Sequence, residues 1–144
     1  MTDKPEISLQ EIFDRVADHL NKQGKASAIF KSNTEYEGDP QSYCQYRHPD
    51  PDQPGVILMC AAGCLMDPAK YTPDMEDCCS NHPLVEDAFP FKVDLRRRDL
   101  ITELQCAHDE GLADAPDLAD LNLWRLRMGT VADNFHLNPT RIHP

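Results

Sequence analysis

The chain contains 144 residues, of which 27% are charged and 40% hydrophobic, and its formal net charge is −11. This acidic balance argues against direct nucleic-acid binding, because clustered lysine and arginine side chains are needed to neutralise phosphates. No stretch approaches the roughly 20 apolar residues of a membrane span, and the first residues lack the apolar run of a signal peptide. We therefore expect residues 1–144 to form a single domain in the cytoplasm, where thiols stay reduced.

The first predicted helix lies between Ser8 and Gly24. Ser8 and Glu11 have the spacing of a capping box, and Gly24 suits the position just after a helix end. Apolar residues recur between them every three or four positions, which predicts one buried stripe: Leu9, Ile12, Phe13, Val16, Ala17 and Leu20. Residues 1–5 are expected to be a flexible tail.

The middle of the chain differs in kind from the helical ends. Residues 35–94 hold twelve acidic and only three basic side chains, together with eight of the twelve prolines. Residues 43–47 and 56–60 favour short strands, and the proline-rich residues 48–55 between them predict the long tip of a β-hairpin. Residues 83–89 are expected to form one or two helical turns.

Two more helices are predicted in the second half. One starts at Asp94 as N-cap and runs towards Gly111, and the other runs from about Asp114 until Asn138 and Pro139 stop it. Three consecutive arginines, 96–98, fall in the first turn of the former and oppose the helix dipole, so we expect them to pair with the acidic middle segment. The predicted fold is an α-rich α+β domain with three main helices packed on a short β-hairpin and a proline-rich loop region.

Cysteine and histidine residues concentrate between positions 44 and 82. Three pairs have three intervening residues, and two such pairs could supply the tetrahedral ligand set of a structural zinc ion. The candidate ligands are Cys60, Cys64, Cys78 and His82. The alternative is a set of buried, reduced cysteines, since Cys60 follows an apolar run.

A catalytic interpretation uses other residues. Cys60 would be the nucleophile of a cysteine-dependent hydrolase, with His108 as its base and Asp109 as the group that orients the base. The alternative for His108 is a hydrogen-bonded residue of the core, four positions after Leu104.

A binding interpretation rests on aromatic and charged side chains. Tyr43, Tyr46 and Arg47 are residue types that anchor partners, so they are candidate binding residues, although Tyr46 and Arg47 could equally fix the hairpin. The acidic middle segment favours docking onto a basic surface of another protein, or it serves only solubility.

Several short motifs carry a resemblance. They are Cys44, Tyr46, Arg47, then Cys60, Ala61, Gly63, Leu65, then Tyr71, Pro73, Met75, Glu76, and Leu104, Gln105, His108, Asp109. They resemble a group of small proteins of unknown activity encoded by tailed bacteriophages and prophages, over nearly the whole chain. The resemblance implies expression inside a bacterial cell and a role in host takeover or counter-defence through protein binding. It centres on Cys44 and Cys60 rather than Cys64, Cys78 and Cys79, which weakens the zinc hypothesis.

We therefore expect a non-enzymatic protein-binding module without a cofactor. The alternatives are a zinc-stabilised binding module and a hydrolase that uses Cys60 and His108.

Overall fold

A computed structural model describes residues 4–24, 27–31, 41–109 and 121–142. Its main helices are α1 (Leu9–Gln23), α4 (Leu95–His108) and α5 (Leu121–Phe135), with the short helices α2 (Ala61–Leu65) and α3 (Pro83–Glu86). Its 3-10 helices are η1 (Pro73–Asp77) and η4 (Thr140–Ile142), and its strands are β1 (Ala28–Lys31), β2 (Gln41–Cys44), β3 (Arg47–Pro49) and β4 (Ile57–Met59).

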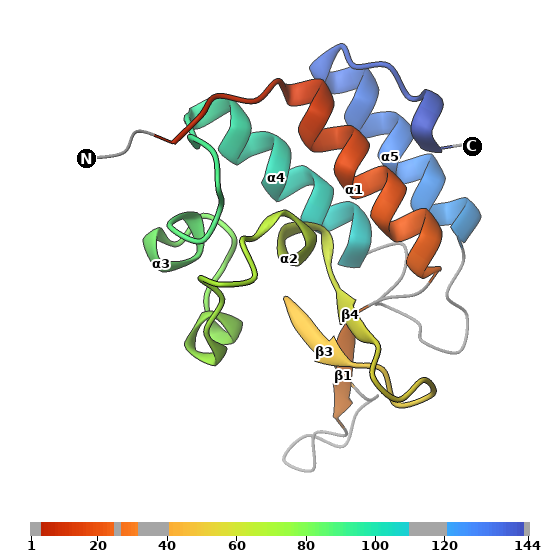
Figure 1. The fold of residues 1–144 in the computed structure, drawn as a ribbon. Helices are drawn as coiled ribbons and strands as arrows, with labels where there is room; N and C mark the ends of the chain where they lie inside the picture. Colours follow the sequence, from red (N-terminus) through yellow and green to blue (C-terminus); the bar gives the residue numbers. More distant parts are fainter. Residues whose placement is uncertain (1–3, 25–26, 32–40, 110–120, 143–144) are drawn as a thin grey trace.

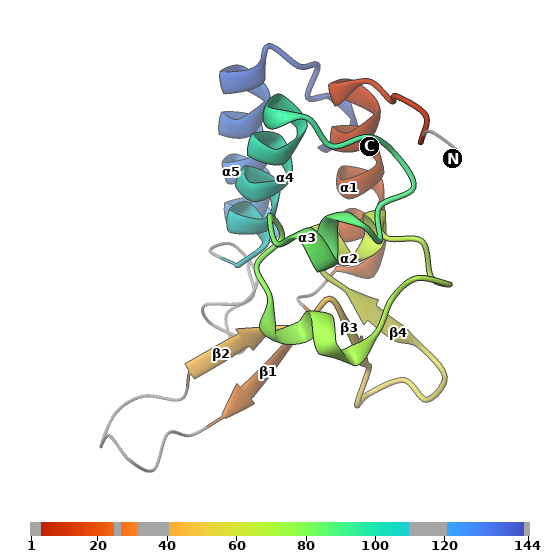
Figure 2. The same cartoon turned by 90° about the vertical axis from the view of Figure 1, so that its left-hand side faces the viewer.

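The predicted fold class is confirmed. Helices α1, α4 and α5 lie side by side in one half of the molecule, and the strands lie in the other half, with α2 between the two (Figure 1). Viewed from the side, the β1–β2 ribbon points away from the three main helices (Figure 2). The protein is therefore an α-rich α+β fold. None of its described helices is long and apolar enough to cross a membrane.

Helix α1 forms as its sequence predicts. The Ser8 hydroxyl accepts a hydrogen bond from the Glu11 amide at 3.0 Å, and Gly24 ends the helix with a left-handed φ of 73°. The buried stripe consists of Ile12, Phe13, Val16, Ala17 and Leu20. This stripe belongs to one continuous core that also includes Trp124 of α5, Leu104 of α4 and Phe89.

Helix α4 starts at the predicted cap, because the Asp94 carboxylate accepts from the Arg97 amide at 2.9 Å. Two of the three arginines pair with acidic groups of the middle segment: Arg98 with Glu86 at 2.5 Å and Arg97 with Asp94 at 2.7 Å. Arg96 instead stacks over the Phe135 ring, 5.4 Å from its centroid. The arginines thus offset an unfavourable position in the helix dipole through local partners.

Helix α5 ends earlier than predicted. Its last residue is Phe135, and His136 adopts a left-handed φ of 55°, so the helix stops before Asn138 and Pro139. Asn138 instead exchanges two hydrogen bonds with Gln10, which fastens the C-terminal segment to α1. The predicted start of this helix near Asp114 lies outside the described residues.

The predicted hairpin is present as β3 and β4, with shorter strands than expected, and a second antiparallel ladder, β1–β2, accompanies it. Strand β2 pairs with β1, and β3 pairs with β4 in the register Arg47↔Met59, His48↔Leu58 and Pro49↔Ile57. The prediction that residues 48 and 49 are irregular was wrong. Proline is tolerated at position 49 because the amides of Arg47 and Met59 point outward, to Glu76 and Gln23, so the backbone nitrogen two residues after Arg47 also faces out of the ladder. The hairpin tip does contain the predicted prolines and turns at Gly55, whose φ is 85°.

Close packing of α2 on the hairpin depends on one glycine. A Cβ atom on Gly63 would lie 2.0 Å from the backbone oxygen of Tyr46. Only glycine allows the two backbones to approach this closely.

The first described residues make hydrogen bonds to the rest of the fold: Lys4 donates to the Asp87 carbonyl, and the Pro5 carbonyl accepts from the Lys92 amide. The expectation that residues 1–5 form a flexible tail stays a prediction.

Candidate functional site

Cys60, the predicted nucleophile, is a capping residue. It is completely buried at the N-terminus of α2, where its sulfur accepts a hydrogen bond from the Gly63 amide at 3.4 Å. This is the role that serine or aspartate usually fills at a helix start. The sulfur therefore lies inside the fold and is bonded to the backbone, away from any substrate in solution.

His108 and Asp109, the other predicted catalytic residues, do form a pair. His108 is fully buried, and its Nδ1 lies 2.9 Å from the Asp109 carboxylate. Its Nε2 accepts a hydrogen bond from the backbone N–H of Ser27 at 3.1 Å, so Nε2 carries no proton and the ring hydrogen is on Nδ1. A general base for Cys60 would need a ring nitrogen that faces the thiol and can take up its proton. The Nε2 of His108 instead accepts the hydrogen bond from Ser27.

The pair formed by His108 and Asp109 belongs to a chain of hydrogen bonds that joins three parts of the fold. Asp109 also accepts from the Gln105 side chain at 3.0 Å, and Gln105 in turn accepts from the Ala62 amide of α2 at 3.0 Å. The Ser27 hydroxyl donates to the carbonyls of Gln45 and Leu58. The network thus ties α4 to α2 and to both ladders, and it satisfies polar groups that would be costly to bury unpaired.

The four candidate zinc ligands are bonded locally. The Cys64 thiol donates to the Ala61 carbonyl, the Cys78 thiol to the Asp74 carbonyl, and the His82 ring accepts from the Leu84 amide as N-cap of α3. Burial raises the pKa of the Cys64 thiol, and the neighbouring Cys60 raises it further. Across the described ranges, no three His, Cys, Asp or Glu side chains are placed to hold a metal ion together.

More accessible thiols lie elsewhere. A cavity of about 270 Å³ opens between η1 and α4, and Cys78, Cys79 and Cys106 are among the residues that line it. Cys79 and Cys106 are exposed, whereas Cys60 is not. The sequence gives no signal that separates exposed from buried cysteines, because the thiols that line this cavity come from segments far apart in the chain.

Tyr46 and Arg47, two predicted binding residues, surround the carboxylate of Glu76. Glu76 accepts from the backbone amides of Tyr46 at 2.7 Å and Arg47 at 3.2 Å, and also from the Tyr71 hydroxyl. Tyr46 is only 6% exposed and its hydroxyl donates to the Cys78 carbonyl, while the Arg47 guanidinium lies 5.6 Å from the Tyr71 ring centroid. Tyr46 therefore fixes the hairpin, which was the alternative to a binding role. The Tyr43 side chain lies outside the described residues.

The Glu76 carboxylate also contributes to a raised pKa of Tyr71. Burial raises the pKa of Tyr71, and the hydrogen bond to Glu76 and the charge of that carboxylate raise it further. Tyr71 therefore stays a hydrogen-bond donor at neutral pH and keeps Glu76 in place.

Both outer edges of the β3–β4 ladder are closed by side chains. Glu76 takes the outward amide of Arg47, and on the opposite edge the Gln23 amide group both accepts from and donates to the Met59 backbone at 2.9 and 3.0 Å. An edge strand with open backbone groups would recruit other strands. The ladder is thus protected against pairing, and a partner must contact its side chains instead. The sequence analysis assigned no role to Gln23 and named Glu76 only within a motif of the resemblance, because single polar residues carry no pattern.

The hairpin carries two exposed apolar side chains at the border of a hollow. Val56 and Ile57 are 40% and 45% exposed, and they border a hollow of about 350 Å³ between β4 and the end of α1. His19 and Lys22 form its α1 side, and Asp50 lines it from the hairpin tip. Burial lowers the pKa of His19, so its ring is neutral at physiological pH.

Charge is distributed unequally between the two halves of the molecule. Residues 41–94 contain nine carboxylates and three basic side chains, which gives −6, whereas residues 121–142 contain three arginines and one carboxylate, which gives +2. The half with the hairpin, η1 and α3 is therefore strongly acidic, and the exposed Val56 and Ile57 lie within it. No protein-family model, curated protein or solved structure matches this chain.

Proposed function

We propose that the chain is a non-enzymatic protein-binding module that uses its acidic hairpin half to dock onto a basic surface of another protein. The observation that carries this proposal is the pair of exposed apolar side chains, Val56 and Ile57, within a segment of net charge −6. Apolar anchors surrounded by charge are typical of specific protein interfaces, where the charges speed and orient association.

The arrangement of the reactive groups supports binding over catalysis. Cys60 and His108 are both fully buried, and the sulfur and both ring nitrogens bond to neighbours within the fold. A nucleophile and its base must instead reach a substrate and each other. The described parts of the chain therefore favour a fold in which these residues carry structural roles.

The resemblance to proteins of tailed phages and prophages suggests the setting. We infer that the protein acts in the cytoplasm of a bacterial host cell, where it binds a host protein during takeover or counter-defence. A basic partner surface suits this role, because nucleic-acid-binding host proteins present such surfaces and an acidic protein competes for them through complementary charge.

Affinity capture from a bacterial extract tests the proposal. The bait is the full chain, compared with an Ile57→Asp variant and with a Leu123→Asp control that changes a side chain of similar exposure, 38%, on α5, outside the acidic half. We expect one or a few basic proteins to be retained by the wild type and by Leu123→Asp, and lost from Ile57→Asp. Retention should fall as the salt concentration rises, since screening weakens exposed charge pairs.

The retained protein is then purified, and its affinity for each bait is measured by calorimetry. We expect at least a tenfold loss for Ile57→Asp relative to the control. Equal retention by wild type and Ile57→Asp would refute the hairpin as the docking surface. Turnover of a substrate that depends on Cys60 would refute the non-enzymatic assignment.

A further inference from the structure

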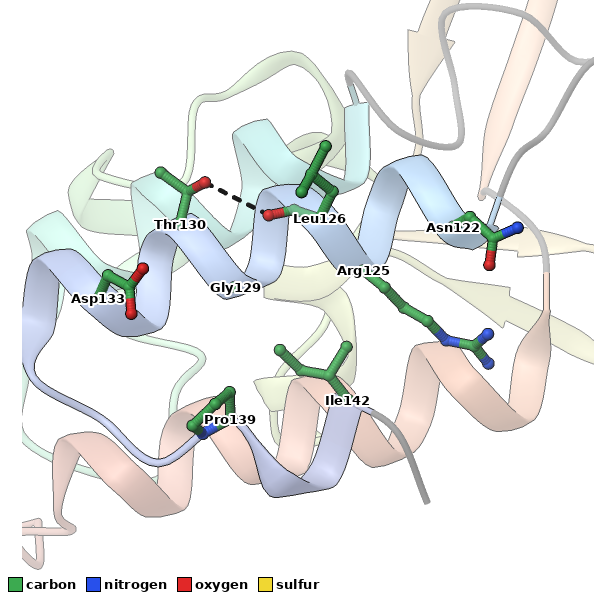
Figure 3. Close-up of a pocket in the computed structure, with 8 residues that line it drawn as sticks. All are labelled: Asn122, Arg125, Leu126, Gly129, Thr130, Asp133, Pro139 and Ile142. Atoms are coloured by element: carbon green, nitrogen blue, oxygen red, sulfur yellow. Dashed lines mark hydrogen bonds between the residues drawn. The ribbon is translucent and has the colours of Figure 1, made fainter.

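Three of the five cysteines whose side chains the structure describes gather at one place. Cys78, Cys79 and Cys106 all line the cavity of about 270 Å³ between η1 and α4. The groove along α5 is larger, about 530 Å³, but none of the described residues that line it carries a thiol or an imidazole. Its Thr130 hydroxyl, moreover, bonds to the Leu126 carbonyl of the same helix (Figure 3). The smaller cavity is therefore the one that brings nucleophilic side chains together.

The cavity has one fixed wall and one wall without regular structure. The fixed wall is a face of α4, on which the lining residues recur three or four positions apart: Thr102, Gln105, Cys106 and Asp109. Gln105 holds this wall in place, because it accepts from the Ala62 amide and donates to the Asp109 carboxylate. The opposite wall includes Cys79, which lies between η1 and α3, outside the helices and strands. This second wall is therefore the one that can move towards the other.

Exposure separates the three thiols of this cavity. Cys79 and Cys106 are both exposed, and they line the cavity from its two different walls. Cys78 is only partly exposed, packs against the core, and donates its thiol to the Asp74 carbonyl at 3.7 Å. Thiol–disulfide exchange requires a sulfur that the reagent can reach. Cys79 and Cys106 are therefore the pair that exchange chemistry can use.

We propose that Cys79 and Cys106 are a redox-sensitive pair that forms a disulfide across this cavity when the surrounding thiol pool becomes oxidised. The oxidant is a low-molecular-weight disulfide such as oxidised glutathione. One thiolate of the pair attacks a sulfur of the small disulfide, which forms a mixed disulfide and releases one small thiol. The second cysteine then attacks the bound protein sulfur, closes the internal S–S bond and releases the second small thiol. Two protein thiols are oxidised, the small disulfide is reduced, and both protons end on the released thiols. This inference goes beyond the proposed function and concerns a different site.

The disulfide would act on the hairpin through residues 76–80. A disulfide holds the two Cβ atoms about 4 Å apart, so it draws this segment onto α4 and closes the cavity. The same segment supports the hairpin, because the Cys78 carbonyl accepts from the Tyr46 hydroxyl and Glu76 accepts from the amides of Tyr46 and Arg47. Fixing the segment should therefore suppress local opening of the hairpin. Where glutathione keeps thiols reduced, the cavity stays open.

Equilibration of the full chain with defined ratios of oxidised to reduced glutathione tests the pair. After quenching, mass spectrometry shows whether the tryptic peptides 71–92 and 99–125, which contain the two cysteines, are cross-linked. The ratio at half oxidation gives the effective concentration of one thiol towards the other. We expect this concentration to be about tenfold higher, or more, in the native chain than in the same chain unfolded in urea, because the fold brings the two walls together.

Three serine variants identify the pair. Cys79→Ser and Cys106→Ser should each abolish the cross-link, whereas the matched control Cys78→Ser, which removes the neighbouring thiol of the same cavity, should keep it. Hydrogen exchange at the Tyr46 and Arg47 amides should be about tenfold slower in the oxidised chain than in the reduced chain.

Three results would overturn the proposal. The first is a cross-link that persists in Cys79→Ser or is lost in Cys78→Ser. The second is an effective concentration that is no higher in the native chain than in the unfolded chain, which needs no variant to measure. The third is unchanged hydrogen exchange at the two hairpin amides after oxidation.

Discussion

Replacing Gly63 with alanine should destabilise the protein severely, because the added methyl group meets backbone and not a movable side chain. The new Cβ would lie 2.0 Å from the Tyr46 oxygen and 2.8 Å from its carbonyl carbon. Non-bonded heavy atoms prefer a separation of about 3.5 Å, so α2 and the hairpin would have to separate by about 1.5 Å.

Neither side of this contact is free to move. Glu76 holds the Tyr46 amide at 2.7 Å, and Gln105 holds the Ala62 amide of α2 at 3.0 Å. Overpacking a core costs about 1–3 kcal/mol when side chains can adjust. We expect Gly63→Ala to reach the top of this range or exceed it, a large share of the 5–15 kcal/mol typical of a domain.

Urea unfolding followed by circular dichroism measures this loss as a lowered midpoint at an unchanged slope. Gly129→Ala is the matched control, because nothing lies within 4 Å of its Cβ position and alanine favours a helix by about 0.5–1 kcal/mol over glycine. The two substitutions should therefore have opposite signs. A Gly63→Ala protein within 0.5 kcal/mol of the wild type would refute the close approach of α2 to the hairpin.

Three further predictions concern single polar side chains. Glu76→Gln turns an amide donor towards backbone donors, so it should lower the free energy of unfolding, measured in urea, by about 2–3 kcal/mol. Tyr71→Phe removes only one hydrogen bond and should lower it by about 1 kcal/mol. Equal losses for the two variants would contradict this account. Asp94→Ala should cost about 1 kcal/mol at pH 7 through loss of the α4 cap. The bond from the Arg97 amide lowers the pKa of Asp94, so this contribution disappears as pH falls through that lowered pKa. For His19, burial lowers the pKa, so the unfolded state takes up the proton first and stability falls below pH 6.5. His19→Gln should flatten that part of the stability profile, and an unchanged profile would assign the loss to other groups.

The helices were predictable because their signals are local. The Ser8 cap, the α1 stripe and the Asp94 cap each depend on residues within a few positions of one another, and each forms as predicted. The end of α5 was misplaced because a left-handed residue at His136 stops the helix. Residues other than glycine take this conformation uncommonly, so one histidine is a weaker stop signal than the Asn138–Pro139 pair.

The hairpin contacts and the candidate site were harder to predict, because the residues that bind each other there are distant in the chain. Ser27 binds His108 across 81 positions, and Met59 is held by Gln23 across 36 positions. The catalytic hypothesis placed Asp109 beside His108, and the two do pair, but the sequence does not reveal that Nε2 of His108 binds a backbone amide. Burial decides whether such residues act or support the fold, and burial depends on the complete packing.

The central claim is that Cys60 and His108 serve the fold and not a reaction. Residue-resolved alkylation of the native protein at neutral pH, read by mass spectrometry and paired with metal analysis of chelator-free protein, tests it most directly. We expect exposed Cys79 to react at the rate of an ordinary thiol, while buried Cys60 reacts only as fast as the protein opens. Alkylation of Cys60 faster than Cys79, or a zinc ion that masks Cys60 and Cys64 until unfolding, would contradict the account.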